Sequence, residues 1–250
     1  MSFDPNDYYK LRNINITGTA NIVNLCIDNK INKLCYVSTI AAIGESSKKE
    51  LISESSEWNI EIDHSVYAIT KYGAEMEVWR GSQEGLDTVI VNPGIIIGPG
   101  YWRVSSGRLF KLINKGQKYY TTGVSGYVDV FDVVNSMIQL MKSTIKNERY
   151  ILVSENLSFK DFAINVAEKL KVKPPNKKAS NLMLNTAWRL DWLTYFFKRN
   201  YRQLTKQMVK SITTDSNYSN EKILKDLPNF KFKKIADSIA STATHFLKDF

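Results

Sequence analysis

The sequence predicts an α/β fold in which a parallel sheet is followed by a mostly helical C-terminal lobe. Short apolar runs rich in Val and Ile alternate with stretches of helical period over the first two thirds of the chain, and this alternation is typical of a parallel sheet. From about Ser158 onward the helical period dominates. With 250 residues, 43% of them hydrophobic, the chain can bury a substantial core.

The elements follow from local pattern and from turn residues. Strands buried on both faces read as continuous apolar runs, helices carry apolar residues at spacings of three and four, and Gly and Pro mark breaks. Gly18 is small enough for close helix packing, and Ser158 is a candidate N-cap. In chain order we expect a helix over 7–29, a strand buried on both faces over 33–39, a helix from 66 to near 85, a strand running into a turn over 87–100, a helix over 107–116, a strand and helix over 126–143, a strand over 149–154, and helices over 158–172, 181–203 and 232–250.

The net charge of +9 does not by itself indicate a charged partner. The basic residues lie mostly after Lys171 and do not form one stripe on a nucleic-acid-binding motif. A solvated basic surface therefore explains the charge better than nucleic acid or an anionic membrane. The expected partner is a small molecule, and a homodimer stays open.

Targeting signals and cysteine usage indicate a cytoplasmic protein. The first residues are polar, which argues against a signal peptide, and no apolar run approaches the ~18 residues of a membrane span. Cys26 and Cys35 lie in apolar sequence, so we interpret them as buried, reduced thiols. Two Cys and two distant His, His64 and His245, are too few for a zinc site.

Tyr67 and Lys71 stand four residues apart in a predicted helix, which places both side chains on one face. The spacing alone decides nothing, because Tyr218 and Lys222 have the same spacing. A neighbouring ammonium favours the phenolate and lowers the tyrosine pKa from its usual ~10. Such a pair can transfer protons near neutral pH.

A third group is needed to hold the substrate oxygen that gains or loses the proton. The strand in "YVSTIAAIG" ends in Ser38 and Thr39, which both carry a hydroxyl. Ligands bind at the carboxyl ends of parallel strands. The sequence therefore predicts a site formed by this strand end and the helix that carries Tyr67 and Lys71.

Five segments in order extend this pattern: "NITGTANIVNLC", "YVSTIAAIG", "YAITKYGAE", "VNPGIIIGPG" and "YVDVFDVV". They are similar to the Asn-x-x-Gly-Thr helix, the Val-Ser-Ser…Gly strand, the Tyr-x-x-x-Lys helix, the strand and turn after it, and a later Val-Asp-Val-x-Asp-Val segment of one family. The chain thus resembles the extended short-chain dehydrogenase/reductase family, in its NAD-dependent epimerase/dehydratase and dihydroflavonol-reductase-like branch. The resemblance is strong to about Ser154 and diffuse beyond. It implies a Rossmann-type parallel sheet.

The resemblance also implies roles for individual residues. Tyr67 would be the general acid/base, and Lys71 would lower its pKa and hydrogen-bond the nicotinamide ribose. Thr39 falls where the family has its catalytic Ser or Thr, with Ser38 as the adjacent alternative. Asn15 matches a helix Asn that helps to order the site. Nothing around Tyr218 matches, so we interpret Tyr218 and Lys222 as a chance pair on a surface segment.

The cofactor implied by the resemblance is NAD or NADP. Ser38, Tyr67 and Lys71 would contact it, together with the backbone of Asn92, Pro93 and Gly94. The last three residues could instead form only a turn. The residue that selects NAD or NADP follows a strand that this sequence lacks.

The opening of the family is absent from the sequence. The family begins with a strand, a Gly-rich turn and a helix N-terminus that holds the pyrophosphate, and no G-x-x-G-x-x-G occurs here. At ~30 residues per βαβ unit, roughly 80–90 residues are missing. The strand over 33–39 would then form an unpaired edge and promote aggregation.

Residues 1–157 are therefore expected to form the C-terminal part of a Rossmann domain with the active site, and 158–250 a helical substrate lobe interleaved with it. The expected activity is NAD(P)-dependent oxidoreduction of a secondary alcohol or ketone, present only with the missing segment. A nucleotide-sugar epimerase or dehydratase would use the same residues, and a truncated, non-catalytic binding or scaffold protein is the alternative of another class. The aromatic residues Trp188, Trp192, Tyr195, Phe196 and Phe197 slightly favour an apolar substrate, although core packing explains them as well.

Overall fold

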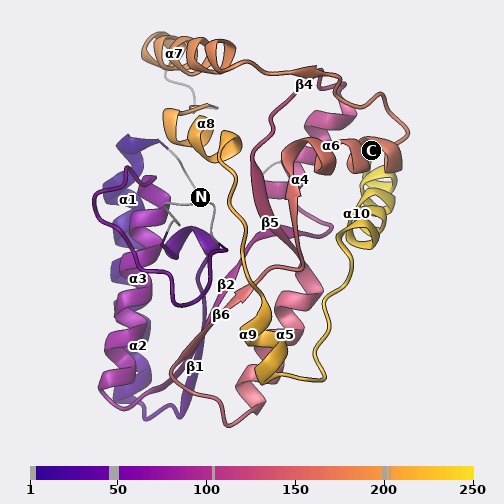
Figure 1. Ribbon diagram of the computed structural model, residues 1–250. Helices are drawn as coiled ribbons and strands as arrows, with labels where there is room; N and C mark the ends of the chain where they lie inside the picture. The colour runs from indigo at the N-terminus through magenta and orange to yellow at the C-terminus, as the bar shows by residue number, and fades with distance from the viewer. Residues whose placement is uncertain (1–3, 45–50, 103–104, 199–201, 203) are drawn as a thin grey trace.

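The computed structural model describes residues 4–44, 51–102, 105–198, 202 and 204–250 (Figure 1). It confirms the predicted α/β fold, with a parallel sheet flanked by helices. The strands are β1 (Lys33–Val37), β2 (Asp87–Pro93), β3 (Ile95–Ile97), β4 (Tyr119–Tyr120), β5 (Val124–Asp129), β6 (Glu148–Leu152), β7 (Glu155–Ser158) and β8 (Lys177–Lys178). The helices are α1 (Tyr8–Arg12), α2 (Gly18–Asp28), α3 (Val66–Gln83), α4 (Ser105–Asn114), α5 (Val130–Lys142), α6 (Phe159–Lys169), α7 (Asn181–Lys198), α8 (Lys206–Thr213), α9 (Glu221–Asp226) and α10 (Ile235–Asp249).

The central sheet contains three parallel strands in the order β1-β2-β6. Figure 1 shows α2 and α3 side by side on one side of these strands, with α5 and α9 on the other. Successive side chains of a strand point to opposite faces. Accordingly, Ile90 of β2 packs with the residues of α2 and α3, whereas Val89 and Val91 pack with those of α5 and α9.

β1 is an edge strand of the described chain, since β2 is its only paired neighbour there. The prediction that this strand is buried on both faces is wrong, because its first four residues are half-buried and Val37 is exposed. The nearby helix α5 also carries exposed apolar side chains, of which Phe131 is 65% exposed. They recur every three or four residues and are called the α5 stripe below: Phe131, Val134, Ile138 and Met141.

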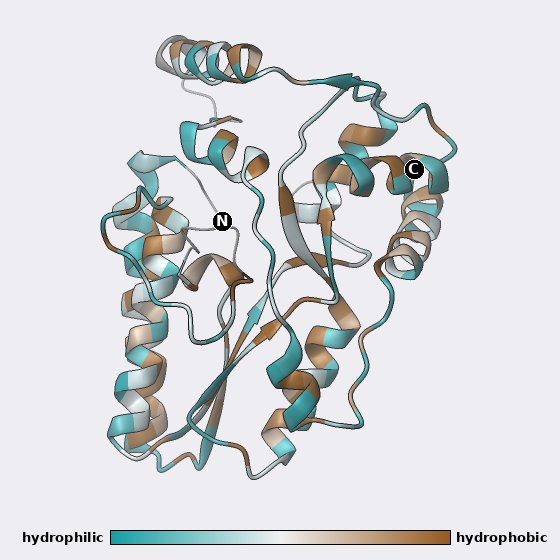
Figure 2. Cartoon of the chain, viewed as in Figure 1, coloured by the Kyte–Doolittle hydropathy of each residue, from teal (hydrophilic) through white to brown (hydrophobic). Residues whose placement is uncertain are grey.

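The chain passes from β2 through Gly94 into β3, which belongs to a second sheet of order β3-β5-β7. Glycine is required at this crossing, because a Cβ on Gly94 would lie only 2.4 Å from the carbonyl oxygen of Gly126. Polar and apolar residues alternate along α6 and α10 (Figure 2). Their apolar sides form one core that contains five large aromatic side chains: Trp102, Phe110, Tyr127, Phe162 of α6 and Phe246 of α10.

The helix predicted over 7–29 contains a π-helical turn at Asn13–Thr17, between α1 and α2. A Cβ on Gly18 would meet only Asn13 O, at 3.8 Å, so close packing at Gly18 was a wrong prediction. The tight contact lies on α3 instead. There, a Cβ on Gly73 would lie 2.6 Å from Ile16, and a Cβ on Gly81 would lie 2.6 Å from Val23.

The cap of α6 was predicted correctly, whereas two helices and the surroundings of Tyr218 and the cysteines differ from the prediction. Ser158 does cap α6, since its side chain accepts a hydrogen bond from Asp161 N. Helices α8 and α9 were not predicted. Tyr218 lies before α9 and packs half-buried against a small core cluster, so its segment is not simply a surface one. Cys26 and Cys35 are free thiols but only half-buried.

None of the helices in the described ranges is long and apolar enough to cross a membrane. Within the same ranges, no group of three or more His, Cys, Asp and Glu side chains could hold a metal ion.

Candidate active site

The predicted site residues meet where β1 ends and α3 begins. Ser65 caps α3 by accepting a hydrogen bond from Ala68 N, and Tyr67 follows in the first helical turn. Thr39 lies two residues beyond β1 in an extended conformation, and its hydroxyl accepts a 3.3 Å hydrogen bond from Ala41 N. This is the end of a parallel sheet at which ligands bind.

Tyr67 and Thr39 are in contact through their hydroxyl groups. Burial raises the pKa of Tyr67 above its ordinary value, and the hydrogen bond from Thr39 opposes this effect by favouring the phenolate. The sequence led us to expect a lowered pKa. The structure differs because loss of hydration at the buried phenol outweighs the favourable interactions.

Lys71 lies one turn after Tyr67 and donates two hydrogen bonds of 2.8 Å, to the Tyr36 hydroxyl and to Val37 O. Its Nζ also lies 4.4 Å from the centre of the Tyr36 ring, close enough for a cation–π contact. Burial lowers the pKa of Lys71 to about 8, whereas the nearby carboxylate of Glu75 raises it. Lys71 is therefore a half-buried ammonium with a reduced preference for its charged form.

Tyr36 is a site residue that the sequence reasoning missed. It alternates with Cys35 along β1, so the pleat turns it toward α2 and α3. Burial raises the pKa of Tyr36, and a hydrogen bond to Thr19 opposes the shift. The alternation in "LCYVS" could have indicated which face Tyr36 occupies, but not that it would meet Lys71.

Asn15 contacts α3 through Thr70 and not through the Tyr67 hydroxyl. Its Nδ2 donates a 3.0 Å hydrogen bond to Thr70 Oγ1. Thr70 in turn donates to the carbonyl oxygens of Val66 and Tyr67. Asn15, which belongs to the π-helical turn, thus ties that turn to the backbone of α3 beside Lys71.

Ser38 and Asn92 lie at the ends of the neighbouring strands β1 and β2, whose register pairs Val37 with Val91. Both side chains are buried. Among the residues that the structure describes, Ser38 Oγ and Asn92 Oδ1 have no hydrogen-bond partner. Buried polar atoms are normally satisfied, so these two atoms mark a place where a bound group can supply the missing contact.

Pro93 and Gly94 belong to the sheet in this structure. Pro93 is the buried last residue of β2, and Gly94 N donates a 3.0 Å hydrogen bond to Leu152 O. The amide nitrogen of Asn92 faces inward to Thr39 and Glu75. The segment is thus an ordered crossing between sheets rather than a loose turn.

Residues 3–177 match the sequence profile of the 3-beta hydroxysteroid dehydrogenase/isomerase family. The chain belongs to this family. It is part of the wider group of extended short-chain dehydrogenases/reductases that also holds NAD-dependent epimerases and dehydratases, so the resemblance noted from the motifs is confirmed.

Individual relatives are similar to this chain in sequence, and solved structures are similar to it in fold. A Synechocystis sp. protein assigned as a dihydroflavonol 4-reductase is 31% identical over 70% of this chain and 53% of its own length. The crystal structure of gox2253 superposes with a TM-score of 0.82 at 22% identity, over 98% of this chain and 75% of that one. The crystal structure of the Bordetella bronchiseptica enzyme WbmH in complex with NAD⁺ superposes with a TM-score of 0.73 at 17% identity, over 99% of this chain and 73% of that one. The chain spans about half the length of the curated relatives it matches.

The family implies a nicotinamide cofactor, and the residues at the strand ends fit its nicotinamide and ribose half. Lys71 supplies an ammonium donor beside the end of β1. Ser38, whose Oγ has no hydrogen-bond partner among the described residues, directly follows Val37, the residue whose carbonyl oxygen accepts from Lys71. A ribose hydroxyl or a carboxamide can satisfy both kinds of donor.

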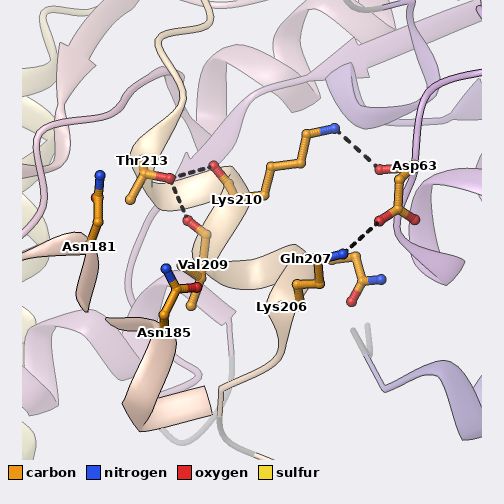
Figure 3. Close-up of a pocket in the computed structure, with 8 residues that line it drawn as sticks. All are labelled: Asp63, Asn181, Asn185, Lys206, Gln207, Val209, Lys210 and Thr213. Carbon is orange, nitrogen blue, oxygen red and sulfur yellow. Dashed lines mark hydrogen bonds and ion pairs between the residues drawn. The ribbon is translucent and has the colours of Figure 1, made fainter. Parts of the chain in front are cut away.

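A separate pocket of about 380 Å³ lies between Asp63, α7 and α8 (Figure 3). Lys210 Nζ donates to Asp63 O over 3.2 Å, and Lys206 Nζ lies 4.0 Å from Asp63 Oδ2. Asn181 and Asn185 project from α7 toward the same space. Asp63 lies four residues before Tyr67, so this polar pocket adjoins the start of α3.

Among the described side chains of α7, Trp188, Trp192 and Tyr195 do not line that pocket. Trp188 packs with the small core of the lobe, and its Nε1 donates to Asn185 Oδ1. Trp192 is 54% exposed. The side chains of Phe196 and Phe197 lie outside the described residues.

Proposed function

We propose that this chain carries the substrate-reducing site of an NAD(P)-dependent oxidoreductase that acts on a secondary alcohol or ketone. The observation that carries the proposal is the contact between the Tyr67 and Thr39 hydroxyls, with the half-buried Lys71 ammonium one helical turn away. An acid/base, an oxygen-holding hydroxyl and a cation are the groups that carbonyl reduction requires.

The bound cofactor would supply or accept the hydride at the substrate carbon. In the reducing direction, Tyr67 gives its phenolic proton to the carbonyl oxygen as the alcohol forms. Thr39 orients that oxygen and donates to the phenolate left behind. A phenol with the ordinary pKa of ~10 is protonated at neutral pH, and burial raises the pKa of Tyr67 further, so Tyr67 begins the reaction in the form that can donate. Lys71 would offset the negative charge on Tyr67.

The similarity to the Synechocystis protein, which is named as a reductase, favours a reductase over an epimerase or dehydratase. Residues 158–250 would supply the substrate side of the site, with the pocket at α7 and α8 as its polar portion. Full activity would also need the Gly-rich strand–turn–helix segment of the family, since the sequence contains no such motif.

The test joins the N-terminal half of the Synechocystis relative in frame to this chain and follows NAD(P)H consumption with aryl and sterol-like ketones. Tyr67→Phe should cut turnover by ~10²–10⁴-fold, the usual contribution of a positioned acid/base. Tyr218→Phe is the matched control and should change turnover little. Equal losses from the two substitutions would contradict the proposal.

A further inference from the structure

A buried chain of polar contacts connects three elements behind the proposed site. Glu75 lies on α3 one turn after Lys71, and its side chain is fully buried. Its Oε1 accepts a 3.2 Å bond from Arg149 on β6, and its Oε2 accepts a 2.9 Å bond from Asn92 on β2. Both carboxylate oxygens therefore face donors, which is the arrangement that suits an ionised Glu75.

Asn92 is the link between this ion pair and the site. Its Nδ2 donates a second hydrogen bond, of 3.0 Å, to the carbonyl oxygen of Thr39. Both neighbours of Nδ2 are acceptors, so the orientation of the amide is fixed by chemistry. The carbonyl that Asn92 holds belongs to the residue whose hydroxyl meets Tyr67.

Arg149 extends the chain to the segment that leads into α3. It donates to the carbonyl oxygens of Glu54 and Ser56, and Glu54 Oε1 accepts from Ile151 N. Trp58, a little further on, stacks between His64 and Tyr72. The approach to Tyr67 and the backbone of Thr39 are thus anchored to the same buried ion pair.

We propose that Asn92, Glu75 and Arg149 are positioning residues that hold Thr39 so that its hydroxyl donates to Tyr67. That this positioning matters for catalysis rests on the proposed function, whereas the positioning of Thr39 itself rests only on the contacts described above. The buried carboxylate of Glu75 on α3 needs its partners from β2 and β6 in place, so Asn92 cannot turn away from Thr39 without leaving one oxygen of Glu75 without a donor. The ion pair therefore restricts Thr39 to one arrangement.

The structural readout is the ¹³Cζ resonance of Tyr67 in tyrosine-labelled 250-residue protein, identified by its absence in Tyr67→Phe. Asn92→Leu and the double variant Glu75→Leu/Arg149→Met are compared with the parent. The double variant removes both charges together, which preserves folding better than removing one. Thermal unfolding and near-ultraviolet circular dichroism verify that each variant is folded.

In the folded variants the Tyr67 resonance should move at neutral pH, and its titration midpoint should rise by about half to one pH unit as the Thr39 hydrogen bond weakens. Glu75→Gln, which keeps one acceptor for Asn92, should give a smaller shift. The matched control is Glu148→Gln/Lys222→Met, which removes a 2.6 Å ion pair from the residue next to Arg149 on β6. An unchanged Tyr67 in the folded double variant, or an equal shift in the control, would overturn the inference.

A kinetic readout separates this inference from the proposed function. In the joined, active protein, the double variant Glu75→Leu/Arg149→Met should lower kcat and shift the alkaline limb of the pH profile, with the KM for cofactor unchanged. If Tyr67→Phe leaves turnover intact, the proposed function fails, while the resonance shift still decides whether the three residues position Thr39.

Discussion

Lys71 on α3 and Tyr36 on β1 are joined by a 2.8 Å hydrogen bond between ammonium and hydroxyl, across 35 residues of sequence. The contact shows that a half-buried strand and the helix beside it share the proposed site. It also places a cation where burial lowers its pKa to about 8.

Lys71→Met should stabilise the protein at neutral pH. The folded pKa of Lys71 lies below its unfolded value of 10.5, so burying the charged form costs stability at all pH values below about 8. That cost fades as the pH rises to the unfolded pKa. Denaturant unfolding should show a gain on the order of 1–3 kcal/mol at pH 7 that shrinks toward pH 10.5. Lys10→Met, at an exposed position of α1, is the control, and a gain that does not depend on pH would contradict the prediction.

Gly81→Ala should destabilise the packing of α2 on α3 by about 1–3 kcal/mol, because its Cβ would lie 2.6 Å from Val23. Val23→Ala in the same chain should restore part of the loss. Gly18→Ala is the matched control and should stabilise by about 0.5–1 kcal/mol, since Gly18 is helical and its Cβ meets no close neighbour. Chemical denaturation of the four proteins measures these differences, and similar losses at both glycines would count against the packing.

The 250-residue chain should self-associate through the edge of β1 and the α5 stripe, which leave unpaired backbone groups and apolar side chains exposed. Phe131→Lys with Ile138→Lys should shift the distribution toward monomer in sedimentation velocity, with little loss of stability. Tyr9→Lys changes an exposed aromatic residue on α1 and should leave association unchanged. A parent protein that is monomeric at high concentration would refute the prediction.

The same chain should bind NAD and NADP weakly. The residues at the strand ends suit the nicotinamide half, but the sequence has no Gly-rich phosphate-binding motif. Hydrogen bonds to charged groups contribute ~1.5–3 kcal/mol each, so the loss of two or three should weaken binding by ~10³-fold or more. Calorimetric titration of both cofactors is the measurement. Micromolar binding by a monomer would mean that the phosphate site lies elsewhere in the chain.

The sequence was sufficient for the fold class and for the elements that carry the site. The apolar run before Ser38 and Thr39 and the helical segment with Tyr67 and Lys71 are local features of the sequence, and such features depend only on neighbouring residues. The order of the motifs then identified the family, which the match over residues 3–177 confirms. The roles of Thr39, Tyr67 and Lys71 stay predictions until the variants above are measured.

The contacts between elements could not be predicted. Whether Lys71 meets Tyr36, or Asn92 meets Glu75, depends on the register of β1 and β2 and on the depth at which α3 packs. The pKa direction of Tyr67 depends on burial, which a pair spacing does not report. The close glycine contact was placed on Gly18 instead of Gly81 because one helix alone does not show which side its partner occupies.

The place of α10 has a consequence for the order in which the chain can fold. This last helix contributes Ile235, Ile239 and Phe246 to the core that also contains Phe110 of α4, and Trp102 Nε1 donates to Asp249 at its end. During synthesis, the core around Phe110 therefore stays open until α10 (Ile235–Asp249) has been made. From the synthesis of α4 until that of α10, the nascent chain exposes the aromatic side chains of this core, so this part cannot finish folding while α10 is still missing.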